Sequence, residues 1–323
     1  MNRQWKTFAK YLLKSSFRRQ IEDLLDRCGE HTVNTPPHRE RSIELLTRQE
    51  TDVGVFSDYI AFLPAIECSI RKGRIPVVDR KTVHNAFLSD YKDANTWEFY
   101  FEQPCGIGLD NLHNESDDIV RSYTSANVPV SLSDCRDETT VAYWRQFARR
   151  YIRPTPTLRQ QLTQTEQALF PQGARVLGVS IREGYAKLFQ MNSRIAAGHP
   201  FQASTEQLLA DAEKRMEQWG CDRLLVTCQT DETVERFRRA FGEQCLYVDR
   251  PRYTFEELPE GEHAKKPARP IDQRQNELDY IREIYLLSRC TSFLCSRNSG
   301  SEAAFIMSDG YEHFYCYDLG LNR

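Results

Sequence analysis

The feature that most constrains this fold is an alternation of short β-branched runs with amphipathic stretches in the second half of the chain. The runs predict strands over residues 176–181, 223–227, 245–248, 292–295 and 313–317. The amphipathic stretches predict helices over residues 204–219, 231–241, 273–288 and 299–308, with Ser204 and Asp231 capping the first two. Strands that alternate with helices form a parallel sheet with helices on both faces. We therefore expect an α/β fold.

The first half of the chain is less regular. Residues 54–79 predict a turn, a helix and then a strand over 75–78, and residues 157–170 predict a further helix. A chain of 323 residues is long enough for about two domains at roughly 100–200 residues each. We expect the boundary near Pro171, which gives an α/β domain over 1–170 and a Rossmann-like domain over 171–323.

Parallel sheets bind ligands at the carboxyl ends of their strands. That rule selects four segments, residues 181–185, 228–231, 249–253 and 296–301. In the last segment a strand ends and a helix begins, so free amide N–H groups favour a bound anion and Gly300 permits close approach. The side chains that add donors there are Ser296, Asn298, Ser299 and Ser301. The alternative is ordinary capping of the helix by Ser299 or Ser301.

Charged residues follow the other strands. The guanidinium of Arg182 can form two parallel hydrogen bonds to a phosphate. Because an anion site is expected in the same crevice, phosphate binding is favoured over a surface ion pair. Arg250 and Arg252 add charge after the third strand, or are solvated loop arginines. Thr230 and Asp231 end the second strand, where Asp231 either accepts hydrogen bonds from a base or ribose or caps the helix. His199 has no assigned chemistry from its neighbours alone.

Composition excludes several functions. The 43 Lys and Arg against 46 Asp and Glu give a net charge of −3, which argues against a nucleic-acid-binding protein. The apolar runs are far shorter than the roughly 18 residues of a membrane span. The 10 cysteines have no C-x-x-C spacing, and we see no secretory signal, so we expect buried free thiols in a cytoplasmic protein.

The first 20 residues carry six basic side chains and no acidic one, with apolar residues at helical spacing. This pattern favours a helix packed on its own domain, which is the commoner arrangement. The alternative is a basic amphipathic helix that lies on an anionic membrane, which would make the protein peripheral at the inner face of the membrane.

No D-x-D triplet, nucleophile elbow, H-E-x-x-H or complete G-x-G-x-x-G occurs in the sequence. We therefore expect no metal and no cofactor. Cationic side chains and helix dipoles are expected to neutralise phosphate charge instead.

Four stretches together resemble a family. They are VLGVSIREGY at 176–185, GHPFQ at 198–202 followed by LLVTCQTD at 224–231, YLLSRCTSFLCSRNSGSEAAF at 285–305, and IPVVD at 75–79 with NTWEFYFEQP at 95–104. In their order and spacing they are similar to bacterial glycosyltransferases related to the nodulation-factor and core α1,6 fucosyltransferases. Members often continue the arginine as R-R-T-D or R-G-T-D, whereas here the run is Arg182-Glu183-Gly184-Tyr185, without the aspartate.

The resemblance implies a GT-B fold, two Rossmann-like domains facing across a cleft. It implies transfer of a sugar, fucose from GDP-fucose, to a glycan or glycolipid acceptor in surface polysaccharide biosynthesis, with inversion and without metal. Arg182 and the amides near 299–301 would hold the diphosphate, and Glu183, ahead of Glu98 and Glu102, would be the base. Glu98, Glu102 and His199 would lie on the acceptor side. Two alternatives remain open: a non-catalytic nucleotide- or glycan-binding protein, and another nucleotide-sugar-modifying enzyme.

Overall fold

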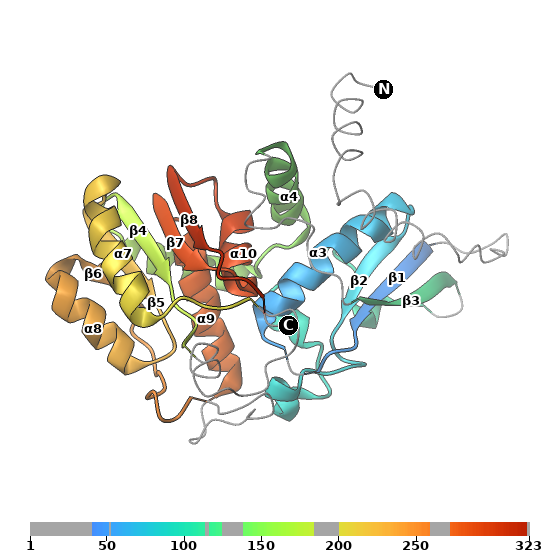
Figure 1. Cartoon of the computed structure of the whole chain (residues 1–323). Coiled ribbons are helices and arrows are strands. Elements are labelled where there is room, and N and C mark those ends of the chain that lie inside the picture. Colours follow the sequence, from blue (N-terminus) through green and yellow to red (C-terminus); the bar gives the residue numbers. More distant parts are fainter. Residues whose placement is uncertain are drawn as a thin grey trace.

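The computed structural model describes residues 41–51, 53–113, 116–124, 138–183, 200–258 and 272–321. They form two parallel sheets separated by helices, which confirms the expected α/β class (Figure 1). The first half contains β1 (Arg41–Arg48), α3 (Val55–Arg71), β2 (Ile75–Asp79), β3 (Asp117–Thr124), α4 (Glu138–Tyr151), α5 (Pro156–Leu169), and the short 3-10 helices η1 (Ala86–Tyr91), η2 (Thr96–Phe99) and η3 (Leu109–Asn111). The second half contains β4 (Val176–Ser180), α7 (Thr205–Gln218), β5 (Arg223–Thr227), α8 (Asp231–Phe241), η5 (Gly242–Gln244), β6 (Cys245–Leu246), α9 (Gln273–Ser288), β7 (Ser292–Ser296), α10 (Ser299–Met307) and β8 (His313–Tyr317).

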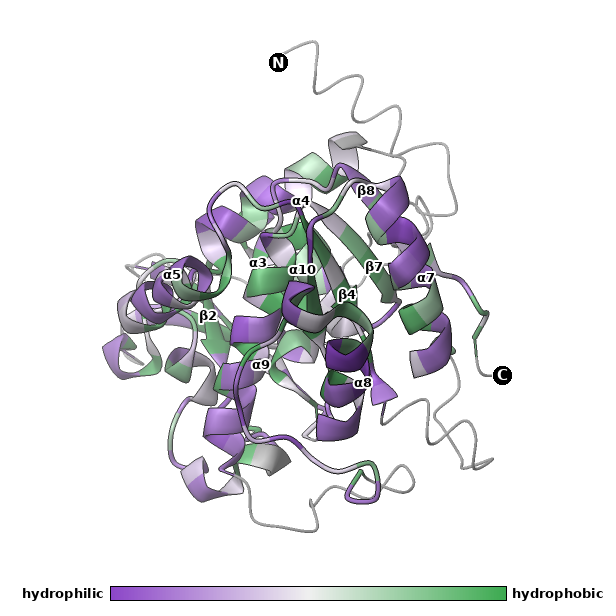
Figure 2. Ribbon diagram, turned by 90° about the vertical axis from the view of Figure 1, so that its left-hand side faces the viewer, coloured by the Kyte–Doolittle hydropathy of each residue, from purple (hydrophilic) through white to green (hydrophobic). Residues whose placement is uncertain are grey.

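The second sheet has five parallel strands in the order β6-β5-β4-β7-β8. Its residues alternate between two apolar layers, because successive side chains of a strand point to opposite faces. Leu177, Leu224 and Leu294 pack with α7 and α8 on one face. Val176 and Phe293 pack with α9 and α10 on the other. Both faces of the sheet are therefore covered by helices, as the sequence predicts; Figure 2 shows the apolar strands inside and the hydrophilic sides of α7 and α8 outside.

The first sheet has three parallel strands in the order β2-β1-β3. Helix α3 lies along one face of it (Figure 1). The other face buries Ile43, Leu45 and Val77 beneath a loop that contributes Ile107 and Leu109. The first sheet is thus smaller than the second and has α3 as the helical layer on one face.

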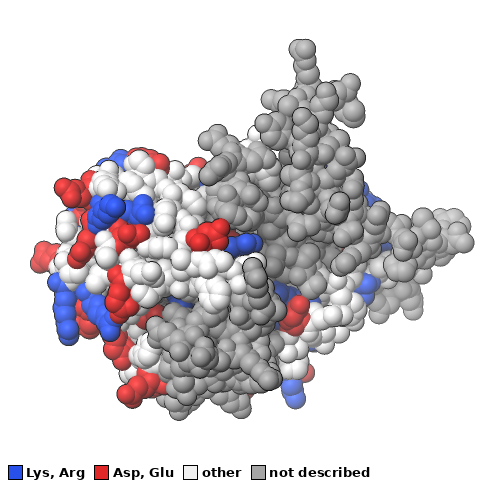
Figure 3. Space-filling view, viewed as in Figure 1, with Lys and Arg blue, Asp and Glu red and all other residues white. Residues whose placement is uncertain are grey.

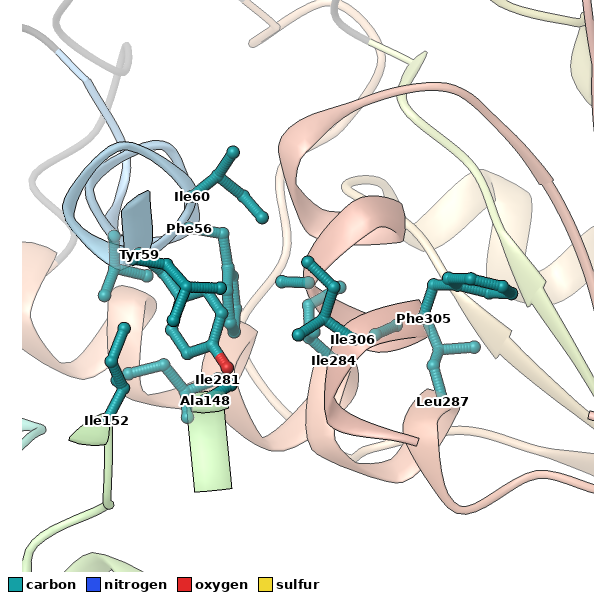
Figure 4. Close-up of a cluster of buried hydrophobic side chains, with 14 of the residues drawn as sticks. Phe56, Tyr59, Ile60, Ala148, Ile152, Ile281, Ile284, Leu287, Phe305 and Ile306 are labelled. Atoms are coloured by element: carbon teal, nitrogen blue, oxygen red, sulfur yellow. The ribbon is translucent and has the colours of Figure 1, made fainter. Parts of the chain in front are cut away.

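The two halves meet through helices. Phe56, Tyr59 and Ile60 of α3 face Ile281 and Ile284 of α9 and Ile306 of α10, and all of these side chains are buried (Figure 4). The apolar cluster is continuous from one half to the other. The geometry of any site between the halves is therefore fixed by close side-chain packing.

Most expected elements of the second half are confirmed. Strand β5 and helices α8 and α9 have the expected bounds, and Ser204 caps α7 in a capping box with Gln207. Helix α8, however, is capped by Thr230 and not by Asp231, because the Thr230 hydroxyl accepts the hydrogen bond from the Thr233 amide. The first half contains β1, β3 and α4, which are not among the expected elements.

Several predictions fall outside the described residues: the basic stretch 1–20, His199, and most of the loop 251–272. Among the residues that are described, none of the helices has the length and apolar character needed to cross a membrane. On the face shown in Figure 3, basic and acidic side chains are interspersed over the second half of the chain, in keeping with the nearly balanced composition.

Candidate functional site

The described parts of the four segments selected from the sequence, which for the first segment end at Glu183, lie along one edge of the second sheet. Strand β4 pairs in parallel with both β5 and β7, so their carboxyl ends point the same way. Thr230, after β5, forms a parallel bridge with Tyr253, and the Gln202 side chain donates to the Arg297 carbonyl after β7 at 2.9 Å. The edge is therefore a continuous rim made of loops that follow neighbouring strands.

Arg182 contacts a residue of α9 that packs against the start of α10. Its guanidinium carbon is 5.9 Å from the centre of the Tyr280 ring on α9, within the range of a cation–π contact. The Tyr280 hydroxyl in turn lies so close to Gly300 that a Cβ at this position would collide with it. Arg182, Tyr280 and Gly300 are thus brought together from three separate elements, and the absence of a side chain at Gly300 makes this possible.

The polar residues at the start of α10 hold the turn in shape. Asn298 caps the helix by accepting from the Ser301 amide at 3.0 Å, and the Ser301 hydroxyl donates to the Ser296 carbonyl at 2.9 Å. The Ser296 hydroxyl accepts from the Ala203 amide at 2.9 Å. The N-cap of the helix is therefore Asn298, and not Ser299 or Ser301 as the capping alternative expected, because the Asn298 side chain reaches the Ser301 amide. The amides of Ser299 and Gly300 are the first of the helix, where intrahelical partners are lacking. Capping and anion binding are compatible at this turn.

Glu183 is enclosed, with 2 % of its surface exposed. Its carboxylate accepts from the Gln229 amide, the Thr230 amide and the Thr230 hydroxyl. These bonds fasten the end of β4 to the end of β5. A general base must offer a lone pair to an acceptor hydroxyl. The Glu183 carboxylate instead binds the end of β5, and Glu183 directly follows Arg182 in the chain.

Arg250 and Arg252 also have partners within the protein. Both guanidiniums bind the Glu283 carboxylate of α9, at 2.9 Å from Arg250 Nε and 3.0 Å from Arg252 Nη2. The Arg250 and Glu283 side chains are 5 % and 2 % exposed. The three residues form a buried ion cluster that ties the segment after β6 to α9, where the sequence suggested diphosphate ligands or solvated arginines.

The remaining predicted residues lie in the first half. Glu98 is exposed and accepts from the Gln103 side chain at 2.7 Å. Glu102 pairs with Arg153 at 2.8 Å and with Arg159 at 3.5 Å. Neither Glu98 nor Glu102 lines the small cavity between the halves, and the partners of both lie within the first half.

A small cavity lies between the halves. Its volume is about 10 Å³, close to what one water molecule requires. Trp97, Tyr100 and Phe101 form an aromatic wall, and the carboxylates of Asp58 from α3 and Glu277 from α9 line the cavity from opposite halves. Glu277 precedes Tyr280 by three residues, so both project from the same side of α9 at roughly 5–6 Å between their Cβ atoms. One side of α9 therefore carries both a residue that lines the cavity and the residue that contacts Arg182.

The two carboxylates have different surroundings. Burial raises the pKa of Asp58 to about 6, although the positive charges of Arg80 and Arg48 oppose this shift. Burial and then the negative charge of Asp58 raise the pKa of Glu277 to about 8. Arg80 is fully buried, with its Nε 3.0 Å from Asp58 Oδ2. Asp58 is therefore paired on its own side, while Glu277 is the more protonated acid at neutral pH.

The comparisons with known proteins agree with this architecture. No family model matches the chain, and the search of curated protein sequences found no match. Arabidopsis thaliana FUT1, solved as a mutant in complex with GDP, superposes on 93 % of this chain and 76 % of its own, with TM-score 0.50 and 9 % identity. The chain has a fucosyltransferase-like GT-B fold. This is the fold that the sequence motifs predict.

Two further fucosyltransferase structures are among those similar to the chain. The fucosyltransferase NodZ from Bradyrhizobium gives TM-score 0.48 at 12 % identity, over 83 % of this chain and 94 % of its own. POFUT1 in complex with GDP-fucose gives TM-score 0.38 at 11 % identity, over 91 % and 78 % of the two chains. Likeness at this identity concerns the fold, so the chemistry has to be argued from the residues of this chain.

Within the fucosyltransferase-like fold, sequence reasoning missed Asp58, Tyr280 and Glu277. A signal existed for two of them. Glu277 precedes Ile281 by four residues and so lies on the apolar stripe of its helix, where an acid is unusual. Asp58 directly precedes the mostly apolar run over residues 59–66 of its helix. In the described ranges no group of three or more His, Cys, Asp and Glu side chains is arranged to hold a metal ion.

Proposed function

We propose that this protein is a glycosyltransferase that moves fucose from GDP-fucose to a hydroxyl of a glycan or glycolipid acceptor, with inversion and without a metal, in surface polysaccharide biosynthesis. The observation that supports it is the placement of Arg182 beside Tyr280 and Gly300 at the start of α10. A guanidinium and the amides of a helix start are the two groups that proteins most readily direct at a diphosphate. In this proposal the donor lies on the rim of the second sheet.

The reaction breaks the bond between the anomeric carbon and the diphosphate oxygen, so negative charge develops on the leaving diphosphate. Arg182 and the amides of Ser299 and Gly300 would stabilise that charge. The ion cluster of Arg250, Arg252 and Glu283 would hold the rim in place. Thr230 and Asp231 lie on the same rim, where Asp231 is exposed and available to the base or ribose of the nucleotide.

The division of labour follows the proposed domains. Residues 171–323 would hold the nucleotide sugar, and residues 1–170 would present the acceptor. The acceptor hydroxyl must lose its proton as it attacks, which requires a base within hydrogen-bond reach. The Glu183 carboxylate already accepts three hydrogen bonds from the end of β5. In this proposal the base is therefore a different residue.

The test of the donor site is calorimetric titration of the full chain with GDP and GDP-fucose. Replacing Arg182 with Ala removes a charge-assisted contact and should weaken binding about 10- to 100-fold. Arg236→Ala is the matched control, because Arg236 is an exposed arginine of the same half, paired with Glu206 on the outer helices. Equal affinity of Arg182→Ala and the control would exclude Arg182 as a diphosphate ligand.

The nucleotide and the metal requirement need a separate experiment. A thermal-shift screen with GDP, UDP, CDP and their sugar forms should raise the melting temperature most for the guanine nucleotides. EDTA should leave turnover unchanged. Failure of every nucleotide to stabilise the chain would reject the proposed function, whereas loss of turnover in EDTA would reject only its metal independence.

A further inference from the structure

The cavity between the halves contains an acceptor atom without a donor. Glu277 is 7 % exposed, and its Oε1 atom has no hydrogen-bond partner among the described residues. A buried carboxylate oxygen left in this way costs free energy, and such atoms usually mark a missing water or ligand. The cavity that Glu277 lines has room for about one water-sized group. The missing partner is therefore a small hydrogen-bond donor such as a hydroxyl.

Asp58 is the other carboxylate in the cavity, but it is already occupied. Its Oδ2 lies 3.0 Å from Arg80 Nε, and its Oδ1 lies 3.4 Å from Arg48 Nη1. Both arginines belong to the first half, so Asp58 is held in an ion cluster on its own side. Glu277 is the carboxylate that reaches the cavity from the half that carries the proposed donor site.

We propose that the cavity binds the reacting hydroxyl of the acceptor and that Glu277 is the catalytic base that removes its proton. The inference rests on the proposed function. The hydroxyl oxygen attacks the anomeric carbon with a lone pair, and the bond from that carbon to the diphosphate oxygen breaks with its electron pair leaving on the diphosphate. The hydroxyl proton passes to the Glu277 carboxylate. Glu277 precedes Tyr280 by three residues on α9, so the base projects from the same side of the helix as the residue that contacts Arg182.

The surroundings of Glu277 suit this task. The ionisable groups that act on it are Asp58 from α3, Tyr100 after η2 and Arg80 after β2. Burial and then Asp58 raise its pKa to about 8, while the hydrogen bond from Tyr100 and the charge of Arg80 lower it. A base is most effective when its pKa lies near the working pH. Because only the ionised form accepts a proton, the rate should rise with pH up to about 8 and then level off.

The experiment measures GDP release from GDP-fucose by the full chain, with water as the acceptor and then with a panel of oligosaccharides. Glu277→Gln keeps the shape of the side chain and should lower kcat about 10²- to 10⁴-fold, with little change in GDP affinity. Asp279→Asn is the matched control. Asp279 is a buried acid of the same helix, bonded to Gln275 and Arg282, and its loss should leave the rate within about threefold.

A second variant separates catalysis from packing. Tyr100→Phe removes the hydrogen bond that lowers the pKa of Glu277, so the rising limb of the rate profile should move to higher pH. A merely structural Glu277 would leave that limb in place. The proposal is overturned if Glu277→Gln retains the wild-type kcat, or if the pH–rate profile of Glu277→Gln still has the rising limb. If the wild-type chain neither binds GDP nor releases it from GDP-fucose, the proposed function itself has failed.

Discussion

Gly300 is the residue on which the donor site depends most directly. A Cβ at this position would overlap the Tyr280 hydroxyl and press on Ile284. Gly300→Ala should therefore displace the Tyr280 ring, and with it the surface on which Arg182 lies. We expect a loss of about 1–3 kcal/mol in the free energy of unfolding, as for other overpacked sites, together with weaker GDP binding.

Gly178→Ala is the control for this substitution. A Cβ at Gly178 would press on Leu287 and Cys290 beneath the centre of β4, away from Tyr280. Denaturant unfolding should show that both variants lose stability, and calorimetry should show that only Gly300→Ala loses affinity for GDP. Equal affinity in the two variants would mean that the start of α10 does not position the diphosphate.

At the scale of elements, Glu283 joins α9 to the segment that follows β6. Glu283→Gln would leave the buried guanidiniums of Arg250 and Arg252 without their counter-charge. Breaking a buried ion cluster from one side typically costs about 3–5 kcal/mol. Glu235→Gln removes an exposed carboxylate that pairs with Arg238 on α8, and should cost less than about 1 kcal/mol. Urea unfolding of both variants checks the difference, and similar midpoints would argue against a stabilising cluster.

Elements defined by local pattern could be predicted from the sequence, and those defined by distant partners could not. Helix α9 has a clear apolar stripe, and β5 is a β-branched run bounded by polar residues, so both have the expected bounds. Strand β3 is half exposed and polar, and it is a strand because β1 pairs with it across about 75 residues of chain. Its sequence alone carries no such information.

Some features of the candidate site could likewise be predicted from the sequence, and others could not. The topology rule places Arg182 and Gly300 at one edge without knowledge of the structure, since parallel strands end together. The roles of Glu183 and Arg250 depend on which buried group lies opposite each of them. Thr230 is 47 residues from Glu183 in the sequence, and Glu283 is 33 residues from Arg250. No local sequence pattern indicates these pairings. Sequence therefore locates the rim, while the structure distinguishes residues that hold it from residues that face a ligand.

At the scale of the whole molecule, the two halves are joined by one apolar layer that contains a pair of acids. Ionising Asp58 and Glu277 together places like charges in a buried interface. The coupling between the halves should therefore depend on pH. Glu277, the base of the proposed reaction, is therefore with Asp58 a source of instability when both carboxylates are charged.

The sign of this dependence follows from proton binding. Glu277 has a pKa of about 8 in the folded chain, well above its usual value of 4.5, so the folded state holds a proton that the unfolded state has already lost. Stability is then greatest below that usual value and falls as pH rises toward 8, by up to about 1.4 kcal/mol per pH unit for one proton. Asp58, with a pKa of about 6, contributes only to the lower part of this window.

Glu277→Gln should reduce the slope of the free energy of unfolding against pH between pH 6 and 8, because the amide does not titrate. Urea unfolding at half-unit steps of pH, for the wild type, for Glu277→Gln and for Glu235→Gln, measures the slope directly. We expect the exposed-site control to follow the wild type. If the slope between pH 6 and 8 is the same in all three proteins, Glu277 is not the group that holds the extra proton, and the interface must be charged through other residues.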